Sequence, residues 1–515
     1  MRRSSILTIS AFSCVLFGLA AVRLNSHSSS AEAAQSPAPP APQAAHLEPV
    51  STTVPAVKPA DIPSPQPSSS PSTLLYTAKR GDTIPALARQ YLKNTSYLTS
   101  SELADAIRNL NGNRSGNILK AGDQITIPGI LPAPIVEKTV PVAKDFEVRA
   151  IYLTGIMAAS DHGIRIIRHW REVGGNAVVF DIKDSDGSVN IPFEHPLLGK
   201  HQVYIHDLPK FVHFLHSENM HAIARIAMFR DERMVVQHPE FAVQSKKTKQ
   251  PWRENGKLVW TDPSQPKVQD FDIALAKFVA QSGADEIQFD YVRFPAEGDQ
   301  KDASFVYQTE QNKENWQRSD VITDFLKKAY AELHPTGVLL SLDVFGVMAW
   351  QRTVDLSHTG QDIVGMAKYC DVLSPMIYPS HFFGMDNIEH PGDAPEHFIG
   401  ESMQRFELIT KGSGVVIRPW LQAFRWRTKT YSPEYIKVQV ATAKEKGGIG
   451  FLFWNAANDY SKPYEAMPEM KAEDLKEGKE KAKYFRGDEL PTVTVKASLS
   501  PATLPTATSA QAVTH

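Results

Sequence analysis

The feature that most constrains the fold is a series of apolar runs that each end in a polar or acidic residue. Residues 286–295 read Glu-Ile-Gln-Phe-Asp-Tyr-Val-Arg-Phe-Pro, a buried-strand pattern that ends at Asp290, with Tyr291 and Arg293 just behind it. Residues 178–184, 339–345 and 415–422 show similar runs, and helix-like segments separate them. In a (β/α)8 barrel the C-terminal ends of the strands converge on one face, which carries the chemistry. The pattern predicts such a barrel, with carboxylates and aromatic residues at its mouth that suit a sugar ligand.

The region from residue 148 to residue 458 alternates strand and helix patterns. The expected strands are 148–157, 176–184, 221–230, 286–294, 338–346, 372–379, 415–424 and 448–456. The expected helices are 162–174, 206–219, 265–283, 318–334, 361–370, 394–411, 432–447 and 464–485. Eight strands, each followed by a helix, make one closed α/β barrel of the TIM type. The longest loops, 231–264 and 296–317, follow the third and fourth strands, and long loops at that face usually build the substrate cleft.

The N-terminus has the pattern of an export signal. Met1-Arg-Arg precedes an apolar run from residue 6 to residue 22, so residues 1–25 are predicted to be a signal peptide or an uncleaved inner-membrane anchor. The rest of the chain is then exported to the periplasm, the cell envelope or the medium. Only two cysteines occur, Cys14 and Cys370, which excludes a disulfide framework. The formal net charge of −2 gives no basic excess, so nucleic acid is not an expected partner.

Two segments lack the apolar residues that a core needs. Residues 26–73 are rich in Pro, Ala and Ser and are predicted to be an extended linker. Residues 487–515 have a similar Thr, Ala and Pro character and are predicted to be a disordered tail.

Between the linker and the barrel, residues 74–129 predict a compact βααβ unit. Its ordered motifs are Tyr76-Thr77, Gly81-Asp82-Thr83, Leu87-Ala88, Leu110-Asn111, and Leu119 through to Pro128. This order resembles the LysM domain throughout its length. The resemblance implies binding of peptidoglycan or another GlcNAc-containing glycan. The implied groove lies beside two turns, whose residues are Gly81, Asp82, Thr83, Ile84, Asn117, Ile118 and Leu119. A small spacer that has lost binding is the alternative.

Carboxylates at strand ends suggest glycoside hydrolysis, which commonly uses one carboxyl group as acid and another as nucleophile or base. The candidates are Asp181, Asp184, Asp290 and Asp343. Strand alternation places Gln288 and Asp290 on one side, and neighbouring strands can bring Asp290 and Asp343 together. A strand-end aspartate can instead cap a helix or pair with Arg225 or Arg293, and the residues leave that alternative open.

The barrel region also resembles an uncharacterised glycoside hydrolase family that is distantly related to α-amylase-type barrels. The motifs that carry the resemblance include residues 149–154, 176–184, 288–295, 343–346, 374–379 and 418–422. The resemblance spans nearly all of residues 149–459, and the barrel domain is placed at 146–486. It implies that Asp290 is the nucleophile. In α-amylase-type barrels the acid is a glutamate at the end of the fifth strand, where the nearest residue here is Asp343. Their third acid, an aspartate after the seventh strand, has no match, and Gln422 lies near its place.

Chitinase-type barrels are the nearest competitor. They carry a glutamate as the acid on the fourth strand, at a position that Val292 occupies here. A chitinase mechanism is therefore disfavoured.

Further polar and aromatic residues at or just past strand ends are predicted to contact substrate, with packing of the mouth as the alternative for the aromatic ones. They are Asp181, Asp184, Arg225, Tyr291, Arg293, Tyr378, Trp420, Gln422, Trp454 and Asn455. No metal-binding or phosphate-loop motif occurs, so no metal and no cofactor are expected. The sequence thus predicts an exported barrel that hydrolyses a polysaccharide and is held on glycan by its LysM unit. A non-catalytic glycan-binding envelope protein with a degenerate barrel is the rival interpretation.

Overall fold

The structure is a computed structural model that describes residues 72–112 and 116–476, with side chains to residue 471. The predicted signal peptide or anchor at residues 1–25, nearly all of the predicted linker, and the predicted tail at 487–515 lie outside the described residues. The last ten residues of the predicted barrel domain, 477–486, do so as well. No helix in the described ranges is both long and apolar enough to cross a membrane.

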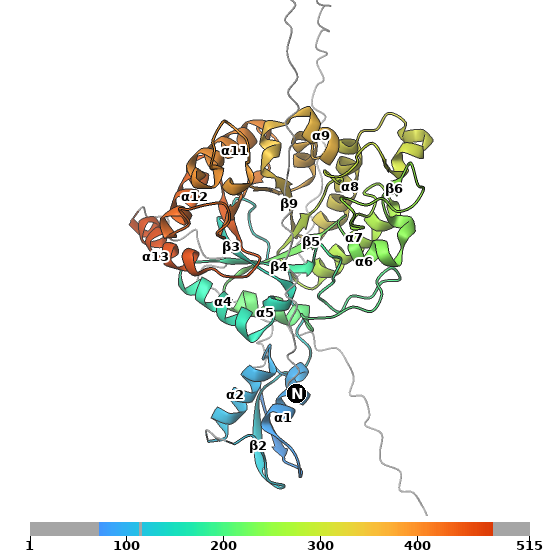
Figure 1. Cartoon of the computed structure of the whole chain (residues 1–515). Coiled ribbons are helices and arrows are strands. Elements are labelled where there is room, and N and C mark those ends of the chain that lie inside the picture. The colour runs from blue at the N-terminus through green and yellow to red at the C-terminus, as the bar shows by residue number, and fades with distance from the viewer. Residues whose placement is uncertain (1–71, 113–115, 477–515) are drawn as a thin grey trace, which may run out of the picture. The chain divides into compact units, whose positions relative to one another are not determined.

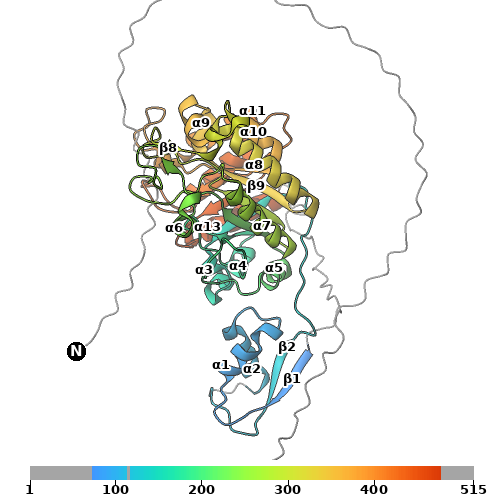
Figure 2. The ribbon, with the colours of Figure 1, turned by 90° about the vertical axis from the view of Figure 1, so that its right-hand side faces the viewer.

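The small domain has the predicted βααβ order. Strand β1 (Ser72–Thr77) pairs antiparallel with β2 (Gln124–Ile130), and α1 (Ile84–Tyr91) and α2 (Ser100–Leu110) lie against the pair, as Figure 2 shows. Thr83 and Thr99 begin the helices, because their side-chain oxygens accept the free N–H groups of Ala86 and Glu102. The buried core includes Ile84, Leu87, Leu103, Ile107, Leu119, Ile125 and Ile127.

The large domain is the predicted closed barrel of parallel strands. Its strands are β3 (Val148–Leu153), β4 (Ala177–Lys183), β5 (His221–Ala227), β7 (Glu286–Asp290), β9 (Leu339–Phe345), β10 (Val372–Met376), the pair β11 (Val416–Ile417) and β12 (Trp420–Gln422), and β13 (Gly450–Trp454). Each pairs with its neighbour, and the β9–β10 pairing closes the ring. The seventh strand divides around Arg418 and Pro419, where proline has no N–H to donate to a ladder. Figure 1 shows the strands at the centre of a ring of helices.

The outer ring contains one or more helices after each strand. They are α3 (Gly155–Ala158), α4 (Asp161–Glu172), α5 (Leu208–Ser217), α6 (Glu232–Gln237), α7 (Pro266–Gln281), α8 (Arg318–Leu333), α9 (Thr353–Thr359), α10 (Ile363–Met366), α11 (Pro395–Ile409), α12 (Pro433–Glu445) and α13 (Ser461–Lys476). Short 3-10 turns lie at Leu92–Asn94, Pro239–Phe241, Val306–Thr309, Gln311–Lys313, His334–Thr336, Gly346–Trp350, Ala367–Tyr369, Pro379–His381 and Pro391–Asp393. The two long loops are joined, because β6 (Gln244–Ser245) pairs antiparallel with β8 (Ala303–Ser304).

Several strands end earlier than the sequence pattern predicts. The fourth strand stops at Asp290 rather than at residue 294, because Tyr291 adopts a left-handed backbone with φ +53°. The first strand stops at Leu153, since α3 begins at Gly155. The helix expected at 361–370 is only α10 followed by a 3-10 turn. These differences place the predicted site residues in turns just beyond the sheet.

The barrel interior is divided along its length. Residues facing inward from β3, β4, β5 and β13 form an apolar cluster that includes Ala150, Val179, Ile223 and Leu452. Strand β7 instead places Glu286, Gln288 and Asp290 along the depth of the barrel, because alternate residues share one side. A polar stripe therefore runs from the amino-terminal end of the barrel, its base, to the carboxyl end, its mouth.

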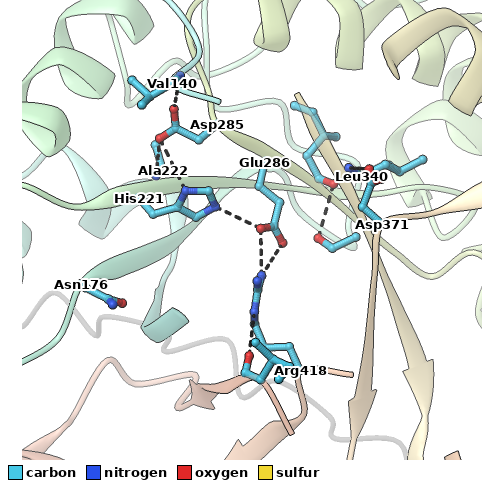
Figure 3. Close-up of polar contacts among 12 residues, drawn as sticks. Val140, Asn176, His221, Ala222, Asp285, Glu286, Leu340, Asp371 and Arg418 are labelled. Carbon is cyan, nitrogen blue, oxygen red and sulfur yellow. Dashed lines mark hydrogen bonds and ion pairs between the residues drawn. The ribbon is translucent and has the colours of Figure 1, made fainter. Parts of the chain in front are cut away.

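The base is closed by a buried ionic cluster (Figure 3). The Arg418 guanidinium donates to both oxygens of Glu286 at 3.0 and 2.8 Å, and His221 Nε2 lies 3.0 Å from the same carboxylate. Each of these three residues has no exposed surface. Although burial alone would raise the pKa of Glu286, Arg418 and His221 lower it to about 2.

At three places in the base, the residue just before one strand caps the start of the adjacent strand. Asn176, Asp285 and Asp371 each stand one residue before a strand, and their side chains accept the N–H of Arg149 (2.7 Å), Ala222 (2.9 Å) and Leu340 (2.9 Å). Asp285 also accepts the N–H of Val140, in the segment that enters the barrel, at 2.7 Å. These side chains satisfy backbone groups that a strand end would otherwise leave unpaired.

Candidate active site at the barrel mouth

The mouth holds one inward-facing side chain from each of seven strands. This mouth cluster consists of Tyr152, Asp181, Arg225, Asp290, Asp343, Trp420 and Trp454. The strand register explains how they meet: Asp181 pairs with Arg225, Arg225 with Gln288, and Gln288 with Ser341. Two residues further along the last two strands, Asp290 and Asp343 fall side by side on the same face. The structure thus brings together the two predicted catalytic residues.

Arg225 is the hub of the mouth cluster. Its Nη1 donates to Asp181 Oδ1 at 2.5 Å, and its Nε and Nη2 donate to Asp290 Oδ2 at 3.1 and 2.5 Å. The Tyr152 hydroxyl donates to the second oxygen of Asp181. Arg225 was predicted to bind substrate, and the structure gives it a positioning role between the two aspartates. The alternative that Asp290 pairs with an arginine therefore holds in the structure. Among the described residues, the other oxygen, Asp290 Oδ1, accepts a hydrogen bond from the N–H of Tyr291 at 2.6 Å.

Asp343 lies deeper than Asp290. Its Oδ1 accepts the indole N–H of Trp420 at 2.6 Å, and 1% of the residue is exposed, against 7% of Asp290. Burial and the nearby Asp290 charge raise the pKa of Asp343 well above its usual range, and the Arg225 and Trp420 contacts only partly oppose this rise. This rise favours the protonated form of Asp343, the state that a general acid requires.

The mouth cluster contains more carboxyl groups than its single guanidinium can neutralise. Burial raises the pKa of Asp181 to about 7, and the nearby Asp184 adds to the rise, while Arg225 opposes it. Asp181 and Asp290 raise the pKa of Arg225 well above its usual value despite its burial. The raised pKa values of Asp181 and Asp343 therefore favour retention of protons within the cluster.

Three aromatic rings form one wall of the mouth. Tyr152 and Trp454 stack with their centroids 4.0 Å apart, and Trp420 meets Trp454 edge-on at 5.7 Å. Arg225 Cζ lies 5.3 Å from the Trp454 centroid, so its cation rests on the same wall. Tyr152 was not predicted as a site residue, although its place two residues after the inward-facing Ala150 on β3 is the alternation signal that points to it.

The turn after β7 carries the other predicted residues of that strand. Arg293 Cζ lies 4.6 Å from the Trp260 ring and 4.4 Å from the Phe345 ring, and its Nη1 donates to the Phe294 carbonyl at 3.0 Å. Burial lowers the pKa of Arg293 and raises the pKa of Tyr291. Trp260 and its hydrogen-bond partner Glu254 come from the long loop after β5, and no periodic signal in that loop predicts them.

Three predicted contact residues bond mainly to the chain itself. The Gln422 side chain accepts the Ser380 hydroxyl hydrogen at 2.8 Å and donates to the Phe424 carbonyl at 3.0 Å. The Asn455 amide donates to the carbonyls of Ala423 and Asp459. Asp184 accepts the N–H of Ser185 in a turn at the edge of the mouth. A further predicted contact residue, Tyr378, is 8% exposed and packs edge-on against Phe424.

The small domain brings its two predicted turns together. Thr83 and Ile118 form an antiparallel bridge, the Ile84 N–H donates to Asn117 O at 2.9 Å, and the Leu119 N–H donates to Asp82 O at 3.1 Å. Ile118 is 82% exposed, whereas Ile84 and Leu119 are buried in the core. Gly81 turns the chain with φ +93°. Of the predicted apolar groove residues, Ile118 is the one that presents a surface.

In the part of the chain that the structure describes, no three His, Cys, Asp or Glu side chains converge in a way that could hold a metal ion.

Two family models match the chain. The family described as "Putative glycosyl hydrolase domain" matches residues 150–460, and the LysM domain matches residues 76–128. Both resemblances inferred from the sequence are confirmed. A comparison with curated proteins found no match.

Three of the solved structures that are similar to this chain illustrate the likeness. A hypothetical protein from Ruminiclostridium thermocellum ATCC 27405 is 34% identical over 38% of this chain and 97% of that chain, with a TM-score of 0.33. The PgaB (BpsB) glycoside hydrolase domain from Bordetella bronchiseptica is 14% identical over 62% and 98%, with a TM-score of 0.47. The spore cortex-lytic enzyme SleL from Bacillus megaterium QM B1551 is 13% identical over 76% and 85%, with a TM-score of 0.37.

Proposed function

The chain belongs to this glycosyl hydrolase family, and on that premise we propose that it is an exported enzyme that hydrolyses a polysaccharide of the cell wall or the surrounding medium. The pattern of residues 1–22 supports export, and the LysM domain supports retention on a GlcNAc-containing glycan such as peptidoglycan. The observation that carries the proposal is the pairing of two differently held carboxyl groups, Asp290 and Asp343, at the mouth of the barrel.

Asp290 has the features of the nucleophile or base. Arg225 donates two hydrogen bonds to its Oδ2, and these fix the orientation of the carboxylate. The left-handed Tyr291 turns the chain away immediately after it, so that the carboxylate ends the strand at the mouth. Its other oxygen is the one that we assign to attack on the anomeric carbon, or to activation of a water molecule beside it.

Asp343 is proposed as the acid that protonates the leaving oxygen. Its raised pKa supplies the proton, and the adjacent Asp290 charge helps to retain it until a leaving group accepts it. The pH–rate profile is expected to be a bell whose two limbs belong to the pair. Asp343→Asn should remove the alkaline limb and spare substrates with good leaving groups.

A digestion panel tests the catalytic proposal. Purified peptidoglycan and a set of polysaccharides are incubated with the full chain, and new reducing ends are identified by mass spectrometry. Asp290→Asn keeps an oxygen acceptor for Arg225 and should lower the rate by about 10²–10⁴-fold, the usual contribution of such a group. Asp270→Asn is the matched control, because Asp270 is an exposed aspartate paired with Lys328. Equal rates for wild type and Asp290→Asn would contradict the assignment.

A non-catalytic glycan-binding protein is the second candidate, and the burial of both carboxyl groups favours it. If no glycan in the panel is cleaved while the chain still binds the glycan, this candidate replaces the first. The contribution of the LysM domain is measured by pulldown of the full chain on insoluble peptidoglycan. Ile118→Asp should reduce retention, whereas Ile156→Asp should not, since Ile156 is a 60% exposed isoleucine on the barrel.

A further inference from the structure

The loop that follows β12 is unusually basic for this chain. Residues 424–430, here named the rim loop, read Phe-Arg-Trp-Arg-Thr-Lys-Thr, and Arg425, Arg427 and Lys429 are exposed. Within the described residues, none of these three side chains forms an ion pair or a hydrogen bond. Three unpaired cations within five residues stand out in a chain whose net charge is −2.

Arg427 is held by aromatic rings rather than by acids. Its Cζ lies 4.1 Å from the Phe383 centroid and 4.5 Å from the Trp426 centroid. A guanidinium that rests on ring faces keeps the N–H donors of its edge available, and that edge matches a carboxylate in a bidentate pair. Phe383 is 53% exposed, so the stack lies at the surface.

The fold supports the rim loop from beneath. Asp393 accepts hydrogen bonds from the Thr428 hydroxyl at 2.8 Å and the Lys429 N–H at 2.6 Å, so it serves the loop backbone and pairs with none of its cations. A side chain at Gly392 would lie 2.1 Å from the Arg427 carbonyl oxygen. Arg427 itself adopts φ +49°, a left-handed backbone that is unfavourable for a residue with a Cβ. Such conformations persist where the surroundings enforce them.

The rim loop is continuous with the active site. Phe424 packs edge-on against Tyr378 at 5.6 Å, and His381 lies 4.9 Å from Trp426. Phe424 and Trp454 both pack against the apolar cluster inside the barrel. A path of aromatic side chains therefore leads from the mouth cluster to Arg427.

We propose that the rim loop is a subsite for a carboxylated sugar: the ring packs on the exposed edge formed by Phe383 and Trp426, and its carboxylate accepts the N–H groups of Arg427. Arg425 and Lys429 attract the same charge. The proposal deepens the proposed function, on which it rests, by naming an acidic polysaccharide as the substrate. The carboxylate can belong to a hexuronic acid or to the lactyl ether of muramic acid, and the two sources share this chemistry.

Equilibrium binding to the full chain tests the subsite. Calorimetry is carried out in an Asp290→Asn background to slow turnover, with a muramic-acid-containing glycan fragment, an oligogalacturonide, and the carboxyl-reduced form of each. Arg427→Gln should weaken binding of a carboxylated probe by about tenfold, as expected for loss of a hydrogen-bonded charge pair, and should leave the reduced form unchanged. Arg427→Lys keeps the charge without the fork and should give an intermediate loss.

A matched arginine provides the control. Arg405 also stacks on a ring, with Cζ 4.9 Å from the Trp350 centroid, but it pairs with Glu401 at 3.2 Å. Arg405→Gln should leave all four affinities unchanged. Preference for one carboxylated probe identifies the source of the acid. Equal affinity for acidic and reduced probes, or equal losses in the two arginine variants, overturns the subsite. Because the experiment measures binding, the subsite proposal can fail or succeed independently of whether Asp290 is catalytic.

Discussion

The base and the mouth of the barrel both bury carboxylates beside an arginine, but they balance charge differently. At the base, Arg418 meets one carboxylate, Glu286, with both of its oxygens bonded. At the mouth, Arg225 bonds two carboxylates, and Asp343 lies next to them without a cation of its own. A balanced buried pair holds strands in place, whereas an excess of carboxyl groups stores a proton. The second arrangement is the one that acid–base chemistry requires.

The two ends titrate in opposite directions even though both are buried. Arg418 and His221 lower the pKa of Glu286 to about 2, whereas burial raises that of Asp181 to about 7 in spite of Arg225. Burial alone therefore does not decide the ionisation state of a carboxyl group in this barrel. The ratio of cations to carboxylates decides it.

Removing the base carboxylate should have the largest effect on stability. Glu286→Gln leaves the Arg418 charge buried without a counterion, so we expect the free energy of unfolding to fall by about 3–5 kcal/mol. The folded-state pKa lies below the unfolded one, so this stabilisation is present above about pH 4.5 and is lost as pH falls through about 2. Denaturant unfolding measures it, with Glu332→Gln at the exposed Lys277 pair as the control. A loss no larger than that of the control would contradict the balanced-pair interpretation.

At the mouth the pH dependence should have the opposite sign. Asp181 has a folded-state pKa above its unfolded one, so its contribution is complete below about pH 4 and is lost as pH rises through about 7. Between these limits the free energy of unfolding of the wild type should fall by roughly 2–4 kcal/mol more than that of Asp181→Asn. One unit of pKa difference corresponds to about 1.4 kcal/mol. Asp272, raised to about 7 beside Lys183, adds a similar slope to both proteins, which cancels in the difference. Parallel curves of unfolding free energy against pH would show that Asp181 is ionised throughout.

This contrast also marks where sequence reasoning succeeded. Alternation along residues 286–290 put Gln288 and Asp290 on one side, and the neighbouring strand was expected to bring Asp343 close to Asp290, as the observed register does. Such regularities survive folding because parallel strands in a barrel share one register and one direction. The predicted barrel and the predicted LysM domain are both confirmed.

The partners of those side chains were harder to predict. Whether Arg225 or Arg293 would pair with Asp290 depends on how a loop leaves the strand, and the left-handed Tyr291 sends Arg293 to Trp260 instead. Gln422 and Asn455 look like sugar ligands in the sequence, yet backbone carbonyls in adjacent turns occupy their amides. The capping of strand starts by Asn176, Asp285 and Asp371 becomes visible only once the strand order is known.

Asp371, one of these capping residues, allows the stability of the base to be tested separately from catalysis at the mouth. Asp371 accepts the N–H of Leu340 at 2.9 Å and the Tyr330 hydroxyl at 3.2 Å. Asp371→Ala should lower the free energy of unfolding by about 1–3 kcal/mol, because a buried N–H loses its acceptor, and it should leave catalytic rates unchanged. Hydrogen exchange at Leu340 locates the effect. Asp371→Asn keeps an acceptor and should be milder; an equal loss would mean that charge, not the hydrogen bond, matters at this position.

The smallest expected effect is a shift of one limb of the pH–rate profile, caused by changing a single hydrogen bond at the mouth. Trp420 donates its indole N–H to Asp343 Oδ1 and so favours the ionised carboxylate. Trp420→Phe removes that donor while keeping an aromatic ring, so the pKa of Asp343 should rise further. The alkaline limb should then move upward by about one pH unit, equivalent to about 1.4 kcal/mol.

Asp290→Asn should move the same limb downward, because the neighbouring negative charge that raises the pKa of Asp343 is gone. The residual activity of this variant suffices for the measurement. If neither variant moves the limb, Asp343 is not the acid. The candidate would then be Glu297, a partly exposed loop carboxylate whose pKa is raised by burial and by Glu254.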